Sequence, residues 1–183
     1  MTLQRIERVL GVCTALGLLI GLYIGLIYAP PDAVQGEVQR LMYLHVPVIL
    51  VSYLAFFVVF VTSILYLGRR SRQYDAIAHS SAEIGTLFTA LAIATGSIWG
   101  RPTWGAWWTW DARLTATAIL LLIFLGYLML RALMEDESRG AAFCAVLGII
   151  GFLDIPIIHM SVVWWRTLHQ PASLLKSGLW TVA

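Results

Sequence analysis

The chain has 183 residues, of which 60% are hydrophobic and 12% charged, and its formal net charge is +2. A mean hydropathy of +0.81 excludes an ordinary soluble domain, and the small net charge argues against a polyanionic partner such as nucleic acid. The charged residues fall between long apolar runs, so the sequence predicts an all-α polytopic membrane protein.

Five apolar runs approach or exceed the length that a helix needs to cross about 30 Å of hydrocarbon. They are continuously apolar rather than alternating, which argues against a β-barrel. The first run is too long for a typical signal-peptide core and lacks a clear small-residue cleavage site, so we interpret it as a retained span. We predict one integral membrane domain over 1–183, with spans at approximately 9–29, 46–68, 83–100, 113–131 and 140–165.

The basic residues predict the orientation of these spans. Five spans place seven arginines on one side, including the cluster "GRRSR" at 68–72, and five basic residues on the other. Since cytoplasmic loops carry an excess of Lys and Arg, we expect the N-terminus in the cytoplasm. The 30–44 loop, the connection near 100–112 and the C-terminal tail are then expected to face outward.

Five of the eight tryptophans lie in one outward-facing stretch, "WGRPTWGAWWTWD", which runs from Trp99 to Asp111. An aromatic belt at the membrane surface accounts for one or two tryptophans per helix end, and accounts poorly for five. Pro102 is compatible with the first position of a short helix. We therefore expect an interfacial helix between spans three and four, with an indole face suited to a large, flat, apolar ligand. On that helix, Trp104, Trp107, Trp108 and Asp111 would fall along one stripe. The tryptophans expected to bind the ligand are Trp99, Trp104, Trp107, Trp108 and Trp110.

Three of the four histidines are predicted on the outer side, whereas His79 is expected in a solvated cytoplasmic loop. Imidazole is a common axial ligand of haem iron, and haem is a flat macrocycle with apolar faces. We expect His45 and His169 to be the axial ligands and His159 to support the pocket wall. Because haem propionates are anionic, two arginines on the same side are candidate partners for them, Arg40 and Arg113.

These motifs resemble the tryptophan-rich WGxxWxWD superfamily of haem-handling proteins in cytochrome c maturation. Within it, "YLHVPV", "WDARLT" and "PIIHMSVVWWRTLHQPAS" resemble the CcmC type, over about Gly36 to Ser173. The family's haem-ligand histidines fall on His45 and His169. Family members resemble six-span proteins, whereas five spans are predicted here.

The resemblance implies a protein of the bacterial cytoplasmic membrane that holds haem b non-covalently at the outer face. It also implies delivery of haem to the chaperone CcmE, beside the ABC-type components CcmA and CcmB and the small subunit CcmD. We expect transfer rather than catalysis on this chain. Asp111 is expected to pin the tryptophan platform or to contact the partner.

Three other classes of function stay open on the sequence alone, and one of them is a purely structural subunit with a heavy aromatic belt at the membrane interface. A related haem lyase would attach haem covalently to an apocytochrome, although such relatives tend to be longer and to carry more histidines. A quinone-binding redox subunit could also use an aromatic surface beside a histidine. A visible absorption spectrum separates these alternatives, because haem gives a Soret band and a quinone does not.

Overall fold

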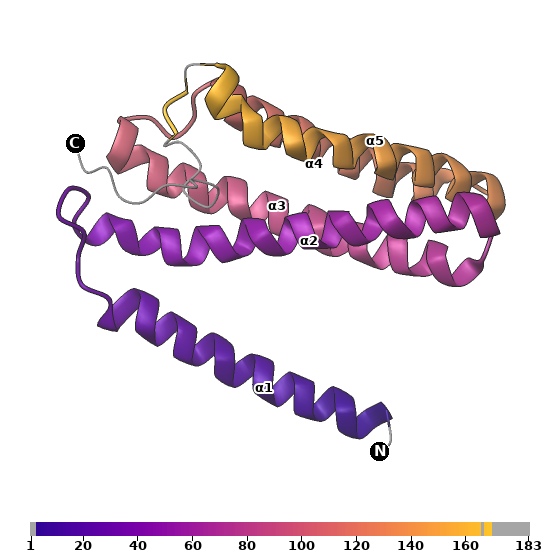
Figure 1. Cartoon of the computed structure of the whole chain (residues 1–183), viewed down its shortest axis with the longest axis horizontal. Helices are drawn as coiled ribbons and strands as arrows, with labels where there is room; N and C mark the ends of the chain where they lie inside the picture. The colour runs from indigo at the N-terminus through magenta and orange to yellow at the C-terminus, as the bar shows by residue number, and fades with distance from the viewer. Residues whose placement is uncertain (1–2, 166, 170–183) are drawn as a thin grey trace.

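Five long helices make up most of the protein. The computed structural model describes residues 3–165 and 167–169. Successive helices run antiparallel to one another (Figure 1). All five are long and apolar enough to cross a membrane, which confirms the predicted all-α polytopic fold. They are α1 (Leu3–Tyr23), α2 (Arg40–Arg69), α3 (Arg72–Trp104), α4 (Ala112–Leu133) and α5 (Glu137–Trp164), with a π-helical turn η1 (Ile24–Tyr28) and a 3-10 turn η2 (Glu37–Gln39).

Helix α1 stands apart from the other four helices (Figure 1). Only 6% of the residues in its most apolar stretch are buried inside the protein, compared with 28–33% in the other four spans. The contact with α2 comes from the η1 turn, where Gly25 lies so close to Tyr43 that a Cβ on the glycine would be 2.9 Å from the tyrosine Cβ. The packed bundle is therefore formed by α2 to α5.

Stacked aromatic rings and small residues hold the bundle together. Phe56 of α2 and Phe124 of α4 stack with their centroids 3.7 Å apart, and both are fully buried. Gly85 on α3 and Gly151 on α5 pass close to these rings. Association of helices in lipid depends on close packing rather than on hydrophobic burial, and small residues allow that approach. The two phenylalanine rings are thus enclosed by glycines from both neighbouring helices.

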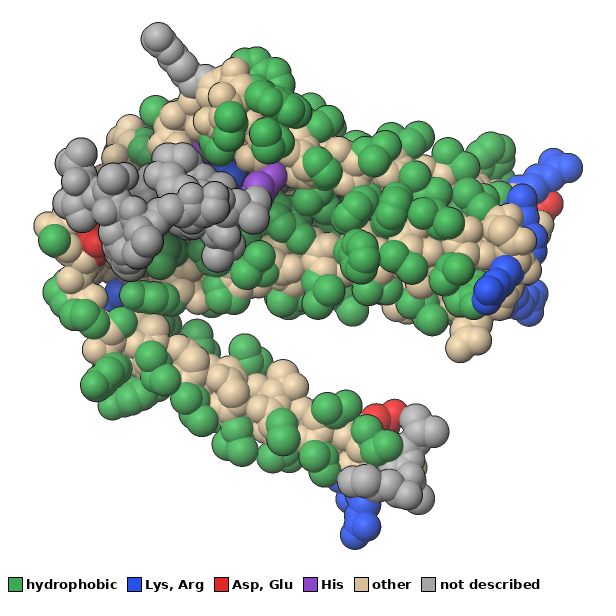
Figure 2. Space-filling model, in the orientation of Figure 1, with side chains coloured by type: hydrophobic (Ala, Val, Ile, Leu, Met, Phe, Trp, Pro, Cys, Tyr) green, Lys and Arg blue, Asp and Glu red, His purple; other side chains and the backbone are tan. Residues whose placement is uncertain are grey.

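Charged side chains gather at the ends of the bundle, and its sides are mostly hydrophobic (Figure 2). At one end, Arg131 pairs with Asp75 at 2.5 Å and Arg72 pairs with Glu137 at 3.1 Å. The antiparallel helices place the 69–72 and 134–136 connections at this end. The connections after α1, α3 and α5 lie at the other end, together with the start of α2, which carries His45, and the last turns of α3, which carry Trp99 and Trp104. Trp107, Trp108 and Trp110 lie in the connection after α3, and His169 follows α5.

The predicted interfacial tryptophan helix is wrong. Helix α3 does not begin anew at Pro102 but continues through it to Trp104, beyond the predicted limit of 83–100. Gly105 ends the helix with a left-handed φ of +80°, and its N–H donates to the carbonyl of Arg101. Residues 106–111 form no helix, and Asp111 becomes the N-cap of α4. The residues expected along one helical stripe are therefore separated. Trp104 ends α3, Trp107 and Trp108 lie in the connection, and Asp111 caps α4.

The close contact at Gly85 predicts a sensitive position in the core. A Cβ at Gly85 would lie 2.4 Å from Cε1 of Phe56, whose ring is already stacked on Phe124 and has no room to move. Gly85→Ala should therefore destabilise the bundle by about 1–3 kcal/mol, as overpacking typically does. Thermal unfolding in mild detergent, followed by circular dichroism, measures this.

Gly126→Ala is the matched control, because nothing lies within 4 Å of a Cβ at that position of α4. It should unfold at or above the temperature of the unmodified protein, since alanine favours helix over glycine. Equal losses in the two variants would contradict the packing described for Phe56.

Candidate functional site

Two histidines and two tryptophans meet at the end of the bundle that carries the tryptophan segment. His45 lies near the start of α2, and its ring centroid is 5.9 Å from that of Trp99. His169 follows α5, and its ring meets the edge of Trp104 at 4.7 Å. Both tryptophans belong to the last turns of α3. The end of α3 therefore supports both imidazoles that the sequence singled out.

The hydrogen bond of His45 defines which of its nitrogens is free. Its Nδ1 lies 3.0 Å from the hydroxyl oxygen of Thr95 on α3. The single hydroxyl proton of Thr95 is already donated to the carbonyl of Leu91 at 2.8 Å. We infer that the hydroxyl oxygen accepts from the Nδ1–H of His45, which leaves a lone pair on Nε2.

Close packing accompanies this hydrogen bond. A Cβ at Gly96 would lie 3.0 Å from Cε1 of His45. The imidazole of His45 is thus held between the hydroxyl of Thr95, the backbone of Gly96 and the ring of Trp99. This confinement fixes the orientation of the ring on a rigid helix pair.

His169 is held by a carboxylate. Its Nδ1 lies 2.9 Å from Oδ2 of Asp111, and the Asp111 side chain is only 8% exposed. A carboxylate accepts, so His169 donates its Nδ1–H and keeps a lone pair on Nε2. Burial lowers the pKa of His169 below its usual value, although the charge of Asp111 and the hydrogen bond to it act in the opposite direction. A lowered pKa favours the neutral imidazole, which is the form that binds metals.

Asp111 also connects three parts of the chain. Its Oδ1 accepts from the N–H of Leu114 and so caps α4, and its Oδ2 accepts from the N–H of Leu168 at 3.3 Å. Residues 106–111 form no helix for Asp111 to pin, so pinning of the tryptophan platform and contact with the partner stay predictions. In the structure, Asp111 ties the segment after α5 to the start of α4.

The other three tryptophans of the 99–111 segment occupy the connection between α3 and α4. Trp107 and Trp110 are exposed, and Trp108 packs edge-on against Trp110 with centroids 5.5 Å apart. The indole N–H of Trp108 and the hydroxyl of Thr109 are buried without a hydrogen-bond partner among the described residues. Unpaired buried donors are costly, so these two groups are suited to a polar ligand group.

The two candidate arginines lie in different surroundings. Arg113, in the first turn of α4, is half-buried and close enough to both imidazoles for its charge to act on them. Its guanidinium makes no hydrogen bond or ion pair within the described part of the chain. Arg40 instead pairs with Glu37 and donates to the carbonyl of Leu26. Arg113 is thus the arginine that the structure brings to the histidines.

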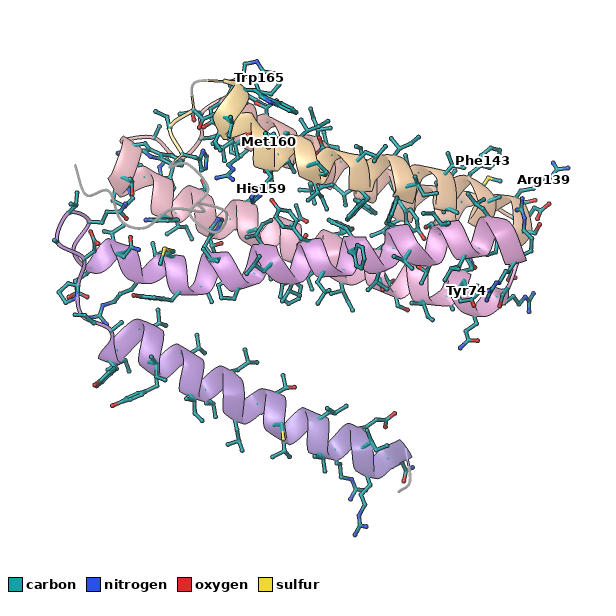
Figure 3. All side chains as sticks on the ribbon, viewed as in Figure 1. Tyr74, Arg139, Phe143, His159, Met160 and Trp165 are labelled. Carbon is teal, nitrogen blue, oxygen red and sulfur yellow. The ribbon has the colours of Figure 1, made fainter. Side chains whose placement is uncertain are left out.

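His159 lies on α5, at the opposite end of the bundle from Arg139 and Tyr74 (Figure 3). It is half-buried, and its imidazole makes no hydrogen bond among residues 3–165 and 167–169. His79 is not in a solvated loop as expected. It belongs to α3, where its ring stacks on Tyr127 and Nε2 lies 3.7 Å from Glu83. Helix α3 begins at Arg72, well before the predicted start at 83, so His79 lies within the helix.

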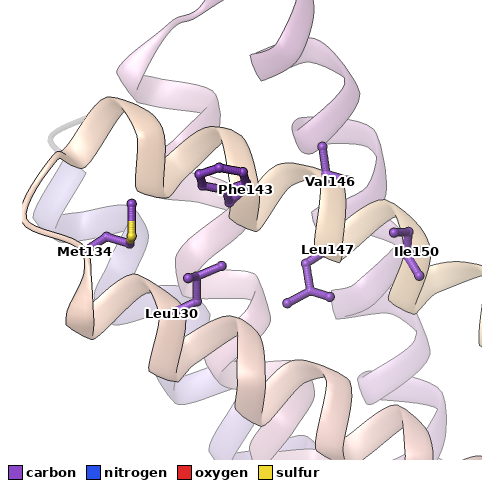
Figure 4. A pocket seen from close by; sticks show the side chains of 6 residues that line it. All are labelled: Leu130, Met134, Phe143, Val146, Leu147 and Ile150. Carbon is purple, nitrogen blue, oxygen red and sulfur yellow. The ribbon is translucent and has the colours of Figure 1, made fainter.

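A hollow of about 420 Å³ lies between α4 and α5, away from the histidines (Figure 4). Its lining is entirely apolar, which makes it unsuitable for metal ligation or for anionic groups. It is lined by Leu130, Met134, Phe143, Val146, Leu147 and Ile150.

Sequence reasoning missed Thr95 and the contact between Asp111 and His169. Thr95 lies within an apolar run, and threonine in such a run usually bonds to its own helix. No pattern in the sequence distinguished it from Thr86 or Thr89. Asp111 and His169 are 58 residues apart, so only the fold brings them together.

The fold and the site define a polytopic helical membrane protein with two oriented imidazoles and a tryptophan-rich connection at one end of its bundle. The chain belongs to the CcmC family, described as heme exporter protein C, whose family model matches residues 1–183.

Curated relatives agree with this assignment. Heme exporter protein C of Bradyrhizobium diazoefficiens is 45% identical over 95% of this chain and 66% of its own length. The proteins of that name from Haemophilus influenzae and Escherichia coli are 42% and 35% identical, over 86% and 93% of this chain and 64% and 69% of their own lengths. The chain thus spans about two thirds of the length of the curated relatives that it matches.

The double role of Asp111 predicts how its substitution affects stability. Asp111→Ala removes the cap of α4 together with both bonds to residues 168–169, and loss of the cap alone should cost about 0.5–2 kcal/mol. Asp111→Asn keeps an oxygen that can cap α4, so it should recover most of that loss. Thermal unfolding in detergent compares the two. An asparagine variant as unstable as the alanine variant would show that the charge, and not the cap, stabilises this end of the bundle.

Proposed function

We propose that this chain handles haem during cytochrome c maturation. It binds haem b non-covalently at the outer face of the bacterial cytoplasmic membrane and passes it to the haem chaperone CcmE. Membership of the CcmC family supports this role, as do the names of its relatives. The role is transfer of a cargo, with no covalent chemistry on the chain itself.

One observation carries the proposal: both predicted ligands are oriented alike. His45 and His169 each donate Nδ1–H to a fixed oxygen and keep the Nε2 lone pair for iron. Histidines that bind metals usually donate the other ring N–H to a carboxylate, carbonyl or similar acceptor, which fixes tautomer and orientation. Neither hydrogen bond would be needed for histidines that act only as polar residues at the membrane surface.

The surroundings of the imidazoles suit a haem. Trp99 and Trp104 lie beside the two rings and would contact the porphyrin, with Trp107, Trp108 and Trp110 of the connection completing the aromatic surface. The guanidinium of Arg113, which has no partner among the described residues, would hold a propionate, and the buried donors of Trp108 and Thr109 could add hydrogen bonds to it. Arg40 remains a second predicted propionate partner, and it would have to leave Glu37. His159 remains a predicted supporting residue of the pocket wall.

We place the site on the periplasmic side and the N-terminus in the cytoplasm. The support is the clustering of arginines at 69–72, with Arg131 and Arg139, at the end of the bundle opposite to the histidines. The ABC-type components CcmA and CcmB and the small subunit CcmD are the proposed partners. The exposed Trp107 and Trp110 leave an aromatic surface available to the chaperone.

The ligation is tested by the visible spectrum of the protein purified in mild detergent. The unmodified protein should show the Soret band of a six-coordinate, low-spin haem, and His45→Ala or His169→Ala should each disturb it, since each removes one axial ligand. His79→Ala is the control, because His79 lies at the other end of α3, and it should leave the band unchanged. If both outer substitutions leave the spectrum unaltered, the axial assignment is wrong and His159 becomes the next candidate. A protein without a Soret band would favour the quinone-binding alternative.

The orientation is tested by reporter fusions. A reporter fused after Arg70 should report the cytoplasm, and reporters fused near Trp104 or after His169 should report the outer side. Two reporters that each work on one side only, alkaline phosphatase outside the cytoplasm and green fluorescent protein within it, give complementary signals at each fusion point. Reporters at Trp104 and His169 that disagree with one another would contradict the shared site itself.

A further inference from the structure

The two candidate iron ligands differ in the group that accepts their Nδ1–H. His169 donates to the carboxylate of Asp111 at 2.9 Å, in a setting where that carboxylate is 8% exposed. His45 donates to the hydroxyl of Thr95 at 3.0 Å, an uncharged group whose own proton is given to Leu91. The pair is therefore chemically asymmetric, although each imidazole presents the same nitrogen.

This difference changes the strength of the two ligands. A carboxylate acceptor draws the Nδ1 proton toward itself and raises the electron density on Nε2, which makes the imidazole a stronger donor to iron. Hydrogen bonds to an ionised acceptor are roughly twice as strong as neutral ones, and low exposure strengthens them further. A hydroxyl has no such charge. His169 is consequently the stronger donor of the two.

The supports of the two residues also differ. His45 is part of α2, whereas His169 lies on the segment after α5 and depends on Asp111 for its position. The same carboxylate accepts from the N–H of Leu168 and caps α4 through Leu114. Asp111 thus compensates for the lack of a helix at His169 and strengthens its ligation.

Building on the proposed function, we propose that His169 is the retaining ligand of the haem and His45 the exchangeable one. Transfer then begins when the bond between iron and Nε2 of His45 breaks and an incoming donor supplies its lone pair to the vacant position. The Nδ1 proton of His45 stays on Thr95's side of the ring throughout, and no electron is transferred. Asp111 and Thr95 are positioning residues in this scheme, since they act through the histidines.

Removal of each ligand in turn tests the order. His45→Gly and His169→Gly are purified in mild detergent with haem, and their haem content is measured after gel filtration with and without imidazole. We expect His45→Gly to keep most of its haem and to regain a low-spin spectrum with imidazole, and His169→Gly to lose most of its haem. The reverse order overturns the proposal.

Substitution of the positioning residues gives a second readout, the midpoint potential of the haem, which a residue with a purely structural role would not change. Asp111→Asn removes the charge and keeps the shape, so the midpoint potential of the haem should rise, because ferric iron loses its stronger donor. Haem loss to excess apomyoglobin should accelerate by about 10–100-fold. Thr95→Val should shift the potential less, and Thr95→Ser should restore it. A shift from Thr95→Val that equals or exceeds that of Asp111→Asn contradicts the proposal.

These outcomes separate the asymmetry from the ligation itself. If neither glycine variant changes the spectrum, the histidines do not bind iron and the proposed ligation is wrong. If both change it and lose haem equally, the ligation stands and only the asymmetry fails. The glycine comparison leaves Asp111 intact, so it decides the matter even if Asp111→Asn does not fold.

Discussion

The carboxylate of Asp111 is the interaction on which the arrangement of this site depends. One oxygen caps α4, and the other accepts from His169 and from the backbone of Leu168. Without it, the segment after α5 would have no polar anchor on the start of α4 among the described residues. The two segments are 58 positions apart in the sequence, and a single buried charge joins them. A local feature, the start of a helix, thereby determines where a distant imidazole lies.

A second constraint comes from Gly105. Its left-handed conformation ends α3 directly after Trp104, so the tryptophans are divided between a rigid helix end and an irregular connection. Trp99 and Trp104 keep fixed positions beside the histidines, whereas Trp107 and Trp110 remain exposed. This division suits a protein that both holds a ligand and presents it. A continuous helix would have placed Trp104, Trp107 and Trp108 along one stripe, so the tryptophans beside the histidines would not be separate from the exposed ones.

Most of the fold could be predicted from the sequence, and the site only in part. Hydrocarbon thickness constrains the length of every span, so apolar runs alone identified five helices. The C-terminal end of α3 was predicted too early because proline favours the first turn of a helix over a later one. In the structure the helix continues through Pro102 and ends only at the left-handed Gly105. The contact of Asp111 with His169 and the role of Thr95 depend on which helix faces pack together. That information is not present in hydropathy or in spacing.

The contrast between the middle of the bundle and its ends explains why the site lies where it does. In the middle of the bundle, glycines such as Gly85 enclose the stacked rings of Phe56 and Phe124, and nothing can move there without disrupting the packing. A ligand that must later be surrendered cannot be held in such a core. At the helix ends, one imidazole can rest on a rigid pair of helices while the other depends on a single carboxylate. Holding and release can then be adjusted by separate hydrogen bonds, and neither adjustment requires the bundle to rearrange.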